Sequence, residues 1–256
     1  MPTAEGFDGV FAALAQSPTI RRIWREAYGD EYPEDAQPFG FITLSMLQRI
    51  AREVHVEPGH TLADLACGSG GPGLWVARAT GARLVGIDYS SIAVRQARQR
   101  AAAFGLSNKA DFLVSEITAI PLPDASLDAA LSVDAFQFFP DQPAALREIA
   151  RIVRPGARLV LTTWDASYPR AQGTRHSSQY QTMLQEAGFA LESYESIPGW
   201  EKMQGAVYTG MLAAQESLTI ELGETVASKL FFEAREFPAR VAERRRVLIV
   251  ARKSTA

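Results

Sequence analysis

The first part of the chain carries apolar residues at helical spacing. They recur on one helical face in the segments 11–15, 20–27 and 41–50. Three prolines separate these stretches, at positions Pro18, Pro33 and Pro38. The acidic, turn-rich segment 28–38 is expected to be a loop. Residues 1–57 are therefore predicted to form an N-terminal helical cap.

From about residue 61 the pattern changes to short apolar runs that alternate with helical segments. The runs predicted as strands are 61–65, 83–88, 111–115, 128–133 and 158–163. The helices predicted between them are 72–80, 90–104 and 143–152, and Ser90 or Ser91 is the expected N-cap of the second. Strands that alternate with helices indicate a parallel sheet covered on both faces.

The last part of the chain mixes helices with two further strands. The helices are predicted over 179–186, 199–220 and 224–237, and the strands over 190–197 and 247–250. The final pair of strands is expected to close the sheet antiparallel. The predicted division is a cap, residues 1–57, and an α/β core, residues 58–256, whose insert at about 198–240 contributes to a substrate pocket.

Composition narrows the class of protein. The chain has 256 residues, of which 47% are hydrophobic and 21% charged, and this is typical of a globular fold rather than a disordered chain. A net charge of −3 gives no basic field for nucleic acid or an anionic membrane. One cysteine, Cys67, excludes an intramolecular disulfide and a cysteine-based zinc site. No apolar run reaches membrane-spanning length, so we expect no association with a membrane. We further expect a cytoplasmic protein, either a monomer or a homodimer, that does not bind nucleic acid.

The most informative stretch is D-L-A-C-G-S-G-G-P-G, which starts at Asp64. A glycine-rich turn between a strand and a helix forms a ledge of free backbone N–H groups that a ligand can approach closely. Asp88 ends the next predicted strand, where a carboxylate can accept both hydroxyls of a ribose. Gly68, Gly70 and Gly73 also satisfy G-x-G-x-x-G, the dinucleotide pattern, although a turn of this kind can simply let a helix pack close to a strand.

The stretch resembles motif I of the class I S-adenosylmethionine-dependent methyltransferases. Segments 86–90, 112–128, 132–136 and 151–159 resemble further motifs of that family in the same order. Within the family, the chain looks most like the small-molecule methyltransferases of bacterial natural-product pathways. The resemblance implies a Rossmann-like, seven-stranded, mostly parallel sheet with an antiparallel last strand, and S-adenosyl-L-methionine as cofactor.

The resemblance also implies which residues hold the cofactor. They are Asp64, Ala66, Gly68, Gly70, Asp88, Tyr89, Glu116, Ile117, Ser132 and Val133. Asp64 would orient the methionine amino group and Asp88 the ribose, whereas Tyr89 would pack on the adenine. Glu116, where the family often has Asp, would accept from the adenine amino group, or it is a solvated strand end. Ala66 replaces the usual glycine, and alanine fits there without strain only if its φ is negative.

Methyl transfer is an in-line displacement, so positioning contributes much of the catalysis, and a base is needed only for a hydroxyl or carbon acid. Sugar O-methyltransferases of this kind often have a histidine after motif IV, but here Gln137 stands there and can only position an acceptor. His176 is the candidate histidine base, unless it is a solvated loop residue, and Asp165 is the second candidate. Asp134 is a further one, unless it caps a helix. No metal is implied.

Aromatic residues concentrate in the predicted cap and after the fifth strand. Those expected to bind the substrate, together with Gln137, are Tyr28, Phe41, Trp164, Trp200 and Tyr208. A helical cap and an insert that enclose such residues favour a sizeable, fairly apolar acceptor, although aromatic residues at helical spacing can also be core. The run 244–246, three arginines, is expected to be a solvated edge rather than an anion site.

The sequence therefore predicts a methyltransferase that acts on O, N or C of a secondary metabolite. The alternative is an S-adenosylmethionine-binding cyclase or pericyclase that has lost methyl transfer, and the missing histidine keeps it open. A weaker alternative is an NAD(P)-dependent reductase, against which about sixty residues precede the glycine turn and no Tyr-x-x-x-Lys dyad occurs. Nothing in the sequence supports a non-enzymatic ligand sensor.

Overall fold

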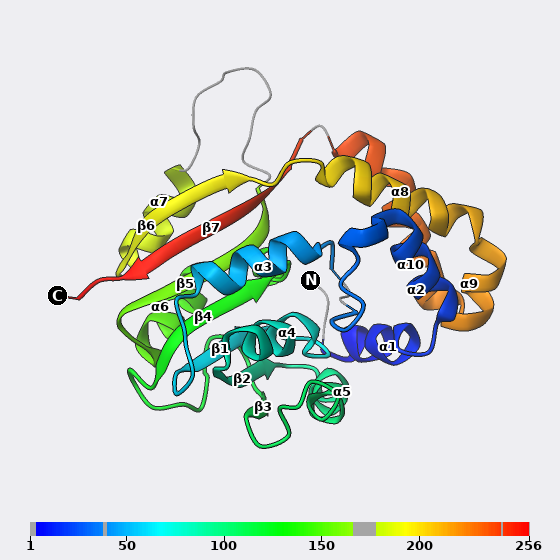
Figure 1. Ribbon diagram of the computed structural model, residues 1–256. Helices are drawn as coiled ribbons and strands as arrows, with labels where there is room; N and C mark the ends of the chain where they lie inside the picture. Colours follow the sequence, from blue (N-terminus) through cyan, green and yellow to red (C-terminus); the bar gives the residue numbers. More distant parts are fainter. Residues whose placement is uncertain (1–3, 38–39, 166–177, 242, 256) are drawn as a thin grey trace.

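The computed structural model describes residues 4–37, 40–165, 178–241 and 243–255 (Figure 1). Within them, seven strands form one sheet in the order β3-β2-β1-β4-β5-β7-β6. The strands are β1 (Thr61–Leu65), β2 (Arg83–Asp88), β3 (Ala110–Val114), β4 (Leu127–Val133), β5 (Val153–Asp165), β6 (Phe189–Ser196) and β7 (Arg245–Lys253). Only β7 runs antiparallel to its neighbours, so the predicted mostly parallel sheet with an antiparallel last strand is confirmed.

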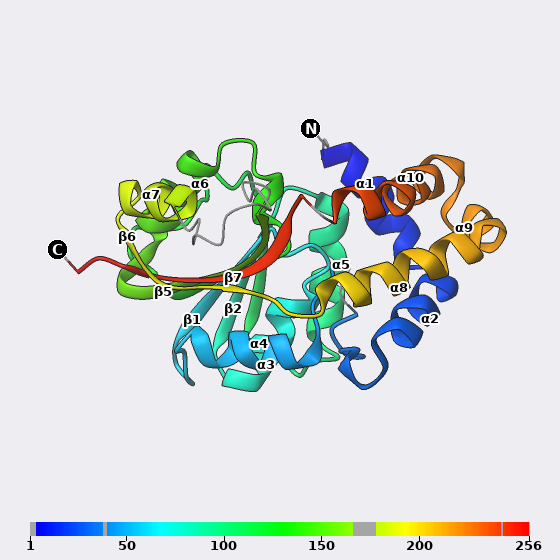
Figure 2. The same ribbon diagram turned by 90° about the horizontal axis from the view of Figure 1, so that it is seen from above.

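Helices cover both faces of the sheet because its central strands are apolar on both sides. Leu62 of β1 faces a core cluster with α3 (Leu44–Glu53), α4 (Gly71–Thr80) and α5 (Ser91–Ala101). Its neighbour Ala63 faces the opposite cluster with α6 (Gln142–Ile152) and α7 (Ser178–Glu186). Figure 2 shows α6 and α7 on one side of the sheet and α3 and α4 on the other.

The remaining helices form a separate lobe beside the sheet (Figures 1 and 2). They are α1 (Ala4–Leu14), α2 (Pro18–Tyr28), α8 (Trp200–Ala213), α9 (Gln215–Leu222) and α10 (Glu224–Arg240). Helix α2 packs against α8, and the N-cap Ser17 and Thr19 both bind the carboxylate of Glu221 in α9. The insert therefore packs on the N-terminal helices, as a two-part cap requires, whereas α3 lies on the sheet beside α4.

The lobe lies at the carboxyl ends of the central strands. Trp164, near the end of β5, packs edge-on against Trp200 at the start of α8, with ring centroids 4.8 Å apart. Phe41, in the segment before α3, packs against both Trp164 and Tyr208 of α8. Two 3₁₀ turns, η1 (Gly29–Glu31) and η2 (Phe136–Phe138), connect longer elements here. Ligands of open α/β sheets bind at this edge, so the lobe roofs the expected site.

Most predicted elements match the observed ones within a few residues. The largest differences are β5, which extends to Val153–Asp165, and the predicted helix 199–220, which breaks at Ala214 into α8 and α9. Ser90 is the N-cap of α5, since its side chain accepts from the backbone N–H of Ala93. Across the parts of the chain that the structure describes, no helix combines the length and apolar character needed to cross a bilayer.

Candidate active site

The glycine-rich turn joins β1 to α4 and is fixed by backbone hydrogen bonds. The N–H of Cys67 donates to the carbonyl of Ile87 in β2 (3.0 Å), and that of Gly70 donates to the carbonyl of Cys67 (2.9 Å). Gly68 and Gly70 have φ of 52° and 78°, in the left-handed region that glycine adopts freely. Ala66 has φ of 55°, so the condition for a strain-free alanine is not met, at a cost of about 1–2 kcal/mol.

Asp64, the second-last residue of β1, is enclosed beneath the start of α4. A Cβ added to Gly73 would lie 2.3 Å from its Oδ2, so only glycine lets the helix approach this closely. The residue is 2% exposed, and among the described residues its Oδ2 has no hydrogen-bond partner. Burial raises the pKa of Asp64 to about 8; the backbone N–H of Gly73 opposes the rise, and the charge of Asp88 adds to it by less. The site therefore holds a buried carboxylate that is suited to a cationic partner.

Asp88 ends β2 and connects the glycine-rich turn after β1 to the turn that precedes α5. Its Oδ2 accepts from the N–H of Gly68 and its Oδ1 from the N–H of Ser90, both at 2.8 Å. Burial raises its pKa, and these backbone donors oppose the rise. Because a carboxylate oxygen accepts more than one hydrogen bond, both oxygens retain capacity for a ligand hydroxyl.

The residues predicted for the adenine lie together beyond Asp88. Tyr89 is half-buried, and burial, with smaller contributions from Asp88 and Glu116, raises its pKa to about 12. Glu116 itself is exposed, whereas Ile117 is buried. The structure thus brings Tyr89 and Glu116 to the same corner, and it leaves the carboxylate of Glu116 open to solvent.

Ser132 and Val133, at the end of β4, border the ledge on the other side. The hydroxyl of Ser132 is fully buried and donates to the carbonyl of Leu65 in β1 (2.9 Å). Val133 is partly exposed. Ser132 therefore fixes the two strands at the ledge, and its own hydroxyl donor is already used.

Helix α1 lies over the ledge, which the sequence analysis did not predict. A Cβ on Gly68 would meet the ring of Phe11 at 3.0 Å, and the ring of Phe7 packs against that of Tyr89. Asp8 accepts hydrogen bonds from the hydroxyl of Ser90 and the N–H of Ile92. The only available signal was the shared apolar face of this helix, and that pattern does not say what the face covers.

Asp134 follows β4 and forms a buried ion pair. Arg246 of β7, 1% exposed, contacts its Oδ2 through Nη2 at 2.6 Å and its Oδ1 through Nε at 3.0 Å. The N–H of Phe41 and the hydroxyl of Thr162 also donate to this carboxylate, each at 2.9 Å. Asp134 caps no helix, and its carboxylate is paired with Arg246, which is buried and is not a solvated edge residue.

The predicted catalytic residues differ in their burial and in their hydrogen-bond partners. The amide of Gln137 is engaged at both ends, since it donates to the carbonyl of Asp134 (2.6 Å) and accepts from the hydroxyl of Thr163 (2.9 Å). The carboxylate of Asp165 is 1% exposed and is bound by the hydroxyl of Tyr194 and by Arg245. His176 lies outside the described residues.

The residues predicted for the acceptor form one aromatic cluster between lobe and sheet. Its members are Tyr28, Phe41, Trp164, Trp200 and Tyr208, all of which belong to or pack against the core of the lobe. Trp24 stacks on Phe41, and Phe237 packs edge-on against both Trp200 and Tyr208. Arg244 lies 4.7 Å above the ring of Trp164. These contacts make the cluster a packed apolar core at the carboxyl ends of β4 and β5.

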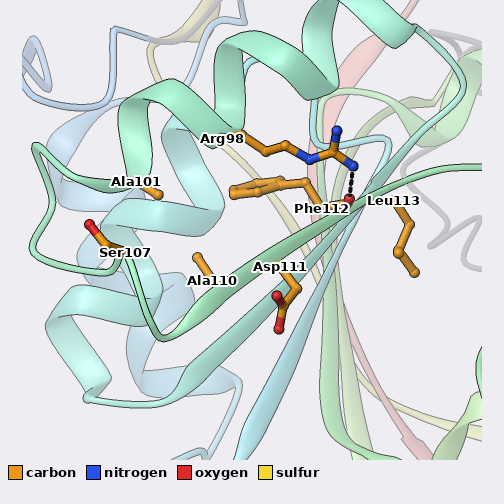
Figure 3. A pocket seen from close by; sticks show the side chains of 7 residues that line it. All are labelled: Arg98, Ala101, Ser107, Ala110, Asp111, Phe112 and Leu113. Atoms are coloured by element: carbon orange, nitrogen blue, oxygen red, sulfur yellow. Dashed lines mark hydrogen bonds between the residues drawn. The ribbon is translucent and has the colours of Figure 1, made fainter.

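A surface groove lies elsewhere, between α5 and the edge strand β3 (Figure 3). It is lined by Arg98, Ala101, Ser107, Ala110, Asp111, Phe112 and Leu113. Arg98 donates to the carbonyl of Phe112, and Asp111 pairs with Arg83, so its charged side chains already have partners. The groove therefore offers no chemistry that competes with the ledge.

Comparison with known proteins agrees with this geometry. The family described as "Methyltransferase domain" matches residues 63–161, from β1 to most of β5. The chain is similar to "Methyltransferase GfsG" of Streptomyces halstedii, with 26% identity that covers 75% of this chain and 74% of the relative. It is also similar to "27-O-demethylrifamycin SV methyltransferase" of Amycolatopsis mediterranei (strain S699), with 28% identity over 77% of this chain and 79% of the relative.

Among solved structures, the [4+2]-cyclase SpnF aligns with a TM-score of 0.73 and 25% identity, covering 83% of this chain and 81% of that one. The family match spans the ledge and the strands that carry it. Residues 63–161 are therefore a methyltransferase domain, and the chain is similar to the class I S-adenosylmethionine-dependent methyltransferases. This assignment sets aside the weaker alternative, a nicotinamide-dependent reductase.

The ledge of this methyltransferase fits its cofactor, S-adenosyl-L-methionine. The unpaired Oδ2 of Asp64 suits the ammonium of the methionine moiety, and the spare lone pairs of Asp88 suit ribose hydroxyls. The glycines at 68 and 70 leave the backbone open to close approach, as S-adenosylmethionine requires of the turn. The structure thus brings the predicted cofactor residues to one edge of the sheet.

Proposed function

We propose that this protein transfers a methyl group from S-adenosyl-L-methionine to a small, fairly apolar secondary metabolite in a natural-product or antibiotic pathway. The observation that carries the proposal is the aromatic cluster beside the ledge, at the carboxyl ends of β4 and β5. An apolar lining with few polar groups is typical of sites for small organic molecules. The cap formed by the N-terminal helices and the insert at about 198–240 would hold this acceptor.

The name of one relative suggests a type of acceptor atom. The Amycolatopsis protein is named for 27-O-demethylrifamycin SV, whose methylation site is an oxygen. Of O-, N- and C-methylation, we therefore propose O-methylation. Small-molecule acceptors also fit the net charge of −3, which gives no basic field for nucleic acid. We further propose a cytoplasmic monomer or homodimer, consistent with the free, buried Cys67.

The residues of the chain would act mainly by binding and orientation. Bound S-adenosylmethionine supplies an electrophilic methyl group on a sulfonium. Asp64 would hold the ammonium and Asp88 the ribose, while α1 and the aromatic cluster would exclude water from the reacting groups. Alignment of the acceptor oxygen behind the methyl carbon then supplies much of the rate enhancement.

A hydroxyl acceptor must also lose its proton, and two residues remain proposed for this step. Asp165 lies at the end of β5, where its charge is balanced by Arg245. His176 belongs to the segment that follows β5. Gln137, with both amide atoms engaged, would hold the turn after β4 in place and position the acceptor through that turn.

One observation favours a second function. The SpnF structure, a [4+2]-cyclase, aligns over most of both chains at 25% identity. A cyclase on this fold would bind the same cofactor and an apolar substrate without transferring the methyl group. The presence of Gln137, which cannot accept a proton, is compatible with that alternative.

A labelled cofactor separates the two functions. The protein would be incubated with S-adenosylmethionine bearing a trideuterated methyl group and with 27-O-demethylrifamycin SV or related hydroxylated polyketides, and the products analysed by mass spectrometry. Methyl transfer requires a product that carries the label. An isomer of the substrate without the label would establish the cyclase instead. Calorimetric titration with S-adenosylhomocysteine tests the cofactor independently, because lack of binding would contradict both functions.

A further inference from the structure

Two polar side chains are buried without a complete set of partners inside the aromatic cluster. Gln204 of α8 is 2% exposed, and its Nε2 donates to the hydroxyl of Tyr208 (2.9 Å). Its Oε1 has no hydrogen-bond partner among the described residues. Tyr28, at the end of α2, is 5% exposed. Its hydroxyl also has no hydrogen-bond partner among the described residues.

These groups lie at the junction between the lobe and the sheet. The phenol of Tyr28 interacts electrostatically with the ion pair of Asp134 and Arg246 and with the phenol of Tyr208. Tyr208 in turn packs on Phe41, with centroids 5.7 Å apart, and carries the bond to Gln204. The polar groups of Tyr28, Tyr208 and Gln204 therefore belong to the core of the lobe, near the ion pair that follows β4.

Such an arrangement costs stability unless something else uses it. A buried polar atom without a partner loses its hydration and gains nothing in return, so Phe and Leu would suit these positions better if packing were their only role. The amide of Gln204 has one unpaired atom whichever way it is turned, because Tyr208 engages only one of its two ends. A ligand hydroxyl satisfies either orientation, since it both donates and accepts.

We propose that Tyr28 and Gln204 bind a hydroxyl group of the acceptor and thereby select hydroxylated apolar molecules. This deepens the proposed function and rests on it. Tyr28 would act as a hydrogen-bond partner and not as a base, because burial raises the pKa of its phenol. An analogue without the hydroxyl would leave both side chains unpaired in the complex, which is how buried polar groups discriminate strongly between ligands.

Two conservative variants separate ligand recognition from a structural role. Tyr28→Phe removes one unpaired polar atom with little change in shape. Gln204→Leu is combined with Tyr208→Phe, so that the hydroxyl of Tyr208 is not left without its donor. If the atoms serve a ligand, both variants should unfold at the same or a higher denaturant concentration than the parent and should bind S-adenosylhomocysteine unchanged. If the atoms are instead satisfied by buried water or by the fold itself, the variants should be less stable, and the proposal would be overturned.

Binding is measured with a matched pair of probes, 2-naphthol and naphthalene, in the presence of saturating S-adenosylhomocysteine. We expect the parent to bind 2-naphthol about tenfold more tightly than naphthalene, and each variant to lose that preference. Equal affinity for the two probes in the parent, a preference that survives in both variants, or no binding of either probe would each contradict the proposal.

Two control variants come from the same lobe. Tyr32→Phe removes the hydroxyl of another buried tyrosine of this core, whose charged neighbours are Glu34 and Arg25 and, with smaller effect, Arg21 and Arg100. Met203→Leu changes the residue next to Gln204 on α8. Both should retain the preference for 2-naphthol. Since no step of this test needs methyl transfer, failure of the labelled-cofactor experiment and failure of this proposal are distinguishable.

Discussion

The carboxylate of Asp8 in α1 accepts a hydrogen bond from the hydroxyl of Ser90, the residue that caps α5. The N–H of Ser90 donates at the same time to Asp88, at 2.8 Å. The N-terminal helix is therefore linked through one serine to the carboxylate assigned to the ribose. With Phe11 resting on Gly68, α1 lies where a bound cofactor would be enclosed.

From this linkage we expect Asp8→Ala to speed the release of the cofactor product. Without the bonds from Ser90 and the N–H of Ile92, α1 should leave the ledge more readily, and S-adenosylhomocysteine should dissociate up to about tenfold faster. Stopped-flow fluorescence measures this rate. Gly9→Ala is the matched control, because a Cβ there meets nothing within 4 Å. An unchanged rate in Asp8→Ala would show that α1 does not limit release.

Removal of the Asp88 carboxylate should weaken cofactor binding by roughly 1–3 kcal/mol, since ribose hydroxyls would lose their acceptor. The ledge would also lose the bonds that the N–H groups of Gly68 and Ser90 donate. Calorimetric titration of Asp88→Ala with S-adenosylhomocysteine checks this. Asp111→Ala, which removes an exposed carboxylate from the neighbouring strand, should bind as the parent does. Unaltered affinity in Asp88→Ala would refute the ribose assignment.

The mostly parallel sheet was predictable because the pattern of alternating apolar runs and helical segments admits few other arrangements. The central strand β1 was recognised because three of its five positions, Leu62, Ala63 and Leu65, are apolar and buried. The predicted ends of strands were less accurate where hydrogen bonding to the neighbouring strand, and not hydrophobicity, determines where the strand begins or ends. The early residues of β5 pair with β4 only at Val153 before the register shifts, and that stretch contains Pro155 and Gly156, which argue against a strand.

The cofactor residues were identifiable because they follow one another in motifs, whereas contacts between distant segments were not. Asp134 was assigned as a base because the sequence does not show that Arg246, in the last strand, reaches it through the core. Arg246 was assigned to the surface because arginine is rarely buried unless paired. Gln204 gave no signal at all, since an amide in a helix is ordinary until its burial is known.

Gly73→Ala should disrupt the ledge by separating α4 from β1. The added Cβ would lie 2.3 Å from Oδ2 of Asp64, so α4 must move away from β1. Overpacking of this kind typically costs about 1–3 kcal/mol of unfolding free energy, and the shift should also reduce cofactor affinity. Denaturant unfolding and titration measure the two effects. Gly205→Ala in α8, where the nearest atom lies at an ordinary 3.5 Å, should be neutral or slightly stabilising.

The pair of Asp134 and Arg246 should be essential for stability. Arg246→Leu leaves a buried carboxylate without its cation, and such a loss costs about 3–5 kcal/mol. Combining it with Asp134→Asn should recover part of that cost, because the second change removes the stranded charge. Arg22→Leu, which breaks an exposed pair with Glu26, should cost under about 0.5 kcal/mol. If Arg246→Leu cost no more than this control, the buried pair would contribute nothing to the junction.

The buried Asp64 should make the stability of the cofactor-free protein fall as pH rises. Its pKa is raised to about 8 by burial, whereas an aspartate in the unfolded chain ionises near pH 4. Between about pH 4 and pH 8 the folded state therefore holds a proton that the unfolded state has lost, and by linkage the free energy of unfolding decreases with increasing pH. Asp64→Asn cannot ionise and should remove this part of the pH dependence.

Cofactor binding should lower the pKa of Asp64, so that its side chain loses the proton that it holds in the cofactor-free protein. An ammonium placed beside the carboxylate stabilises the ionised form, so binding of S-adenosylhomocysteine near pH 7 should release a proton. Calorimetry in buffers of different ionisation enthalpy measures the release, and a parallel titration of Asp64→Asn shows whether the proton comes from this residue. A release that persists in the variant would assign the proton to another group. Binding without any release would mean that the ammonium lies away from Asp64.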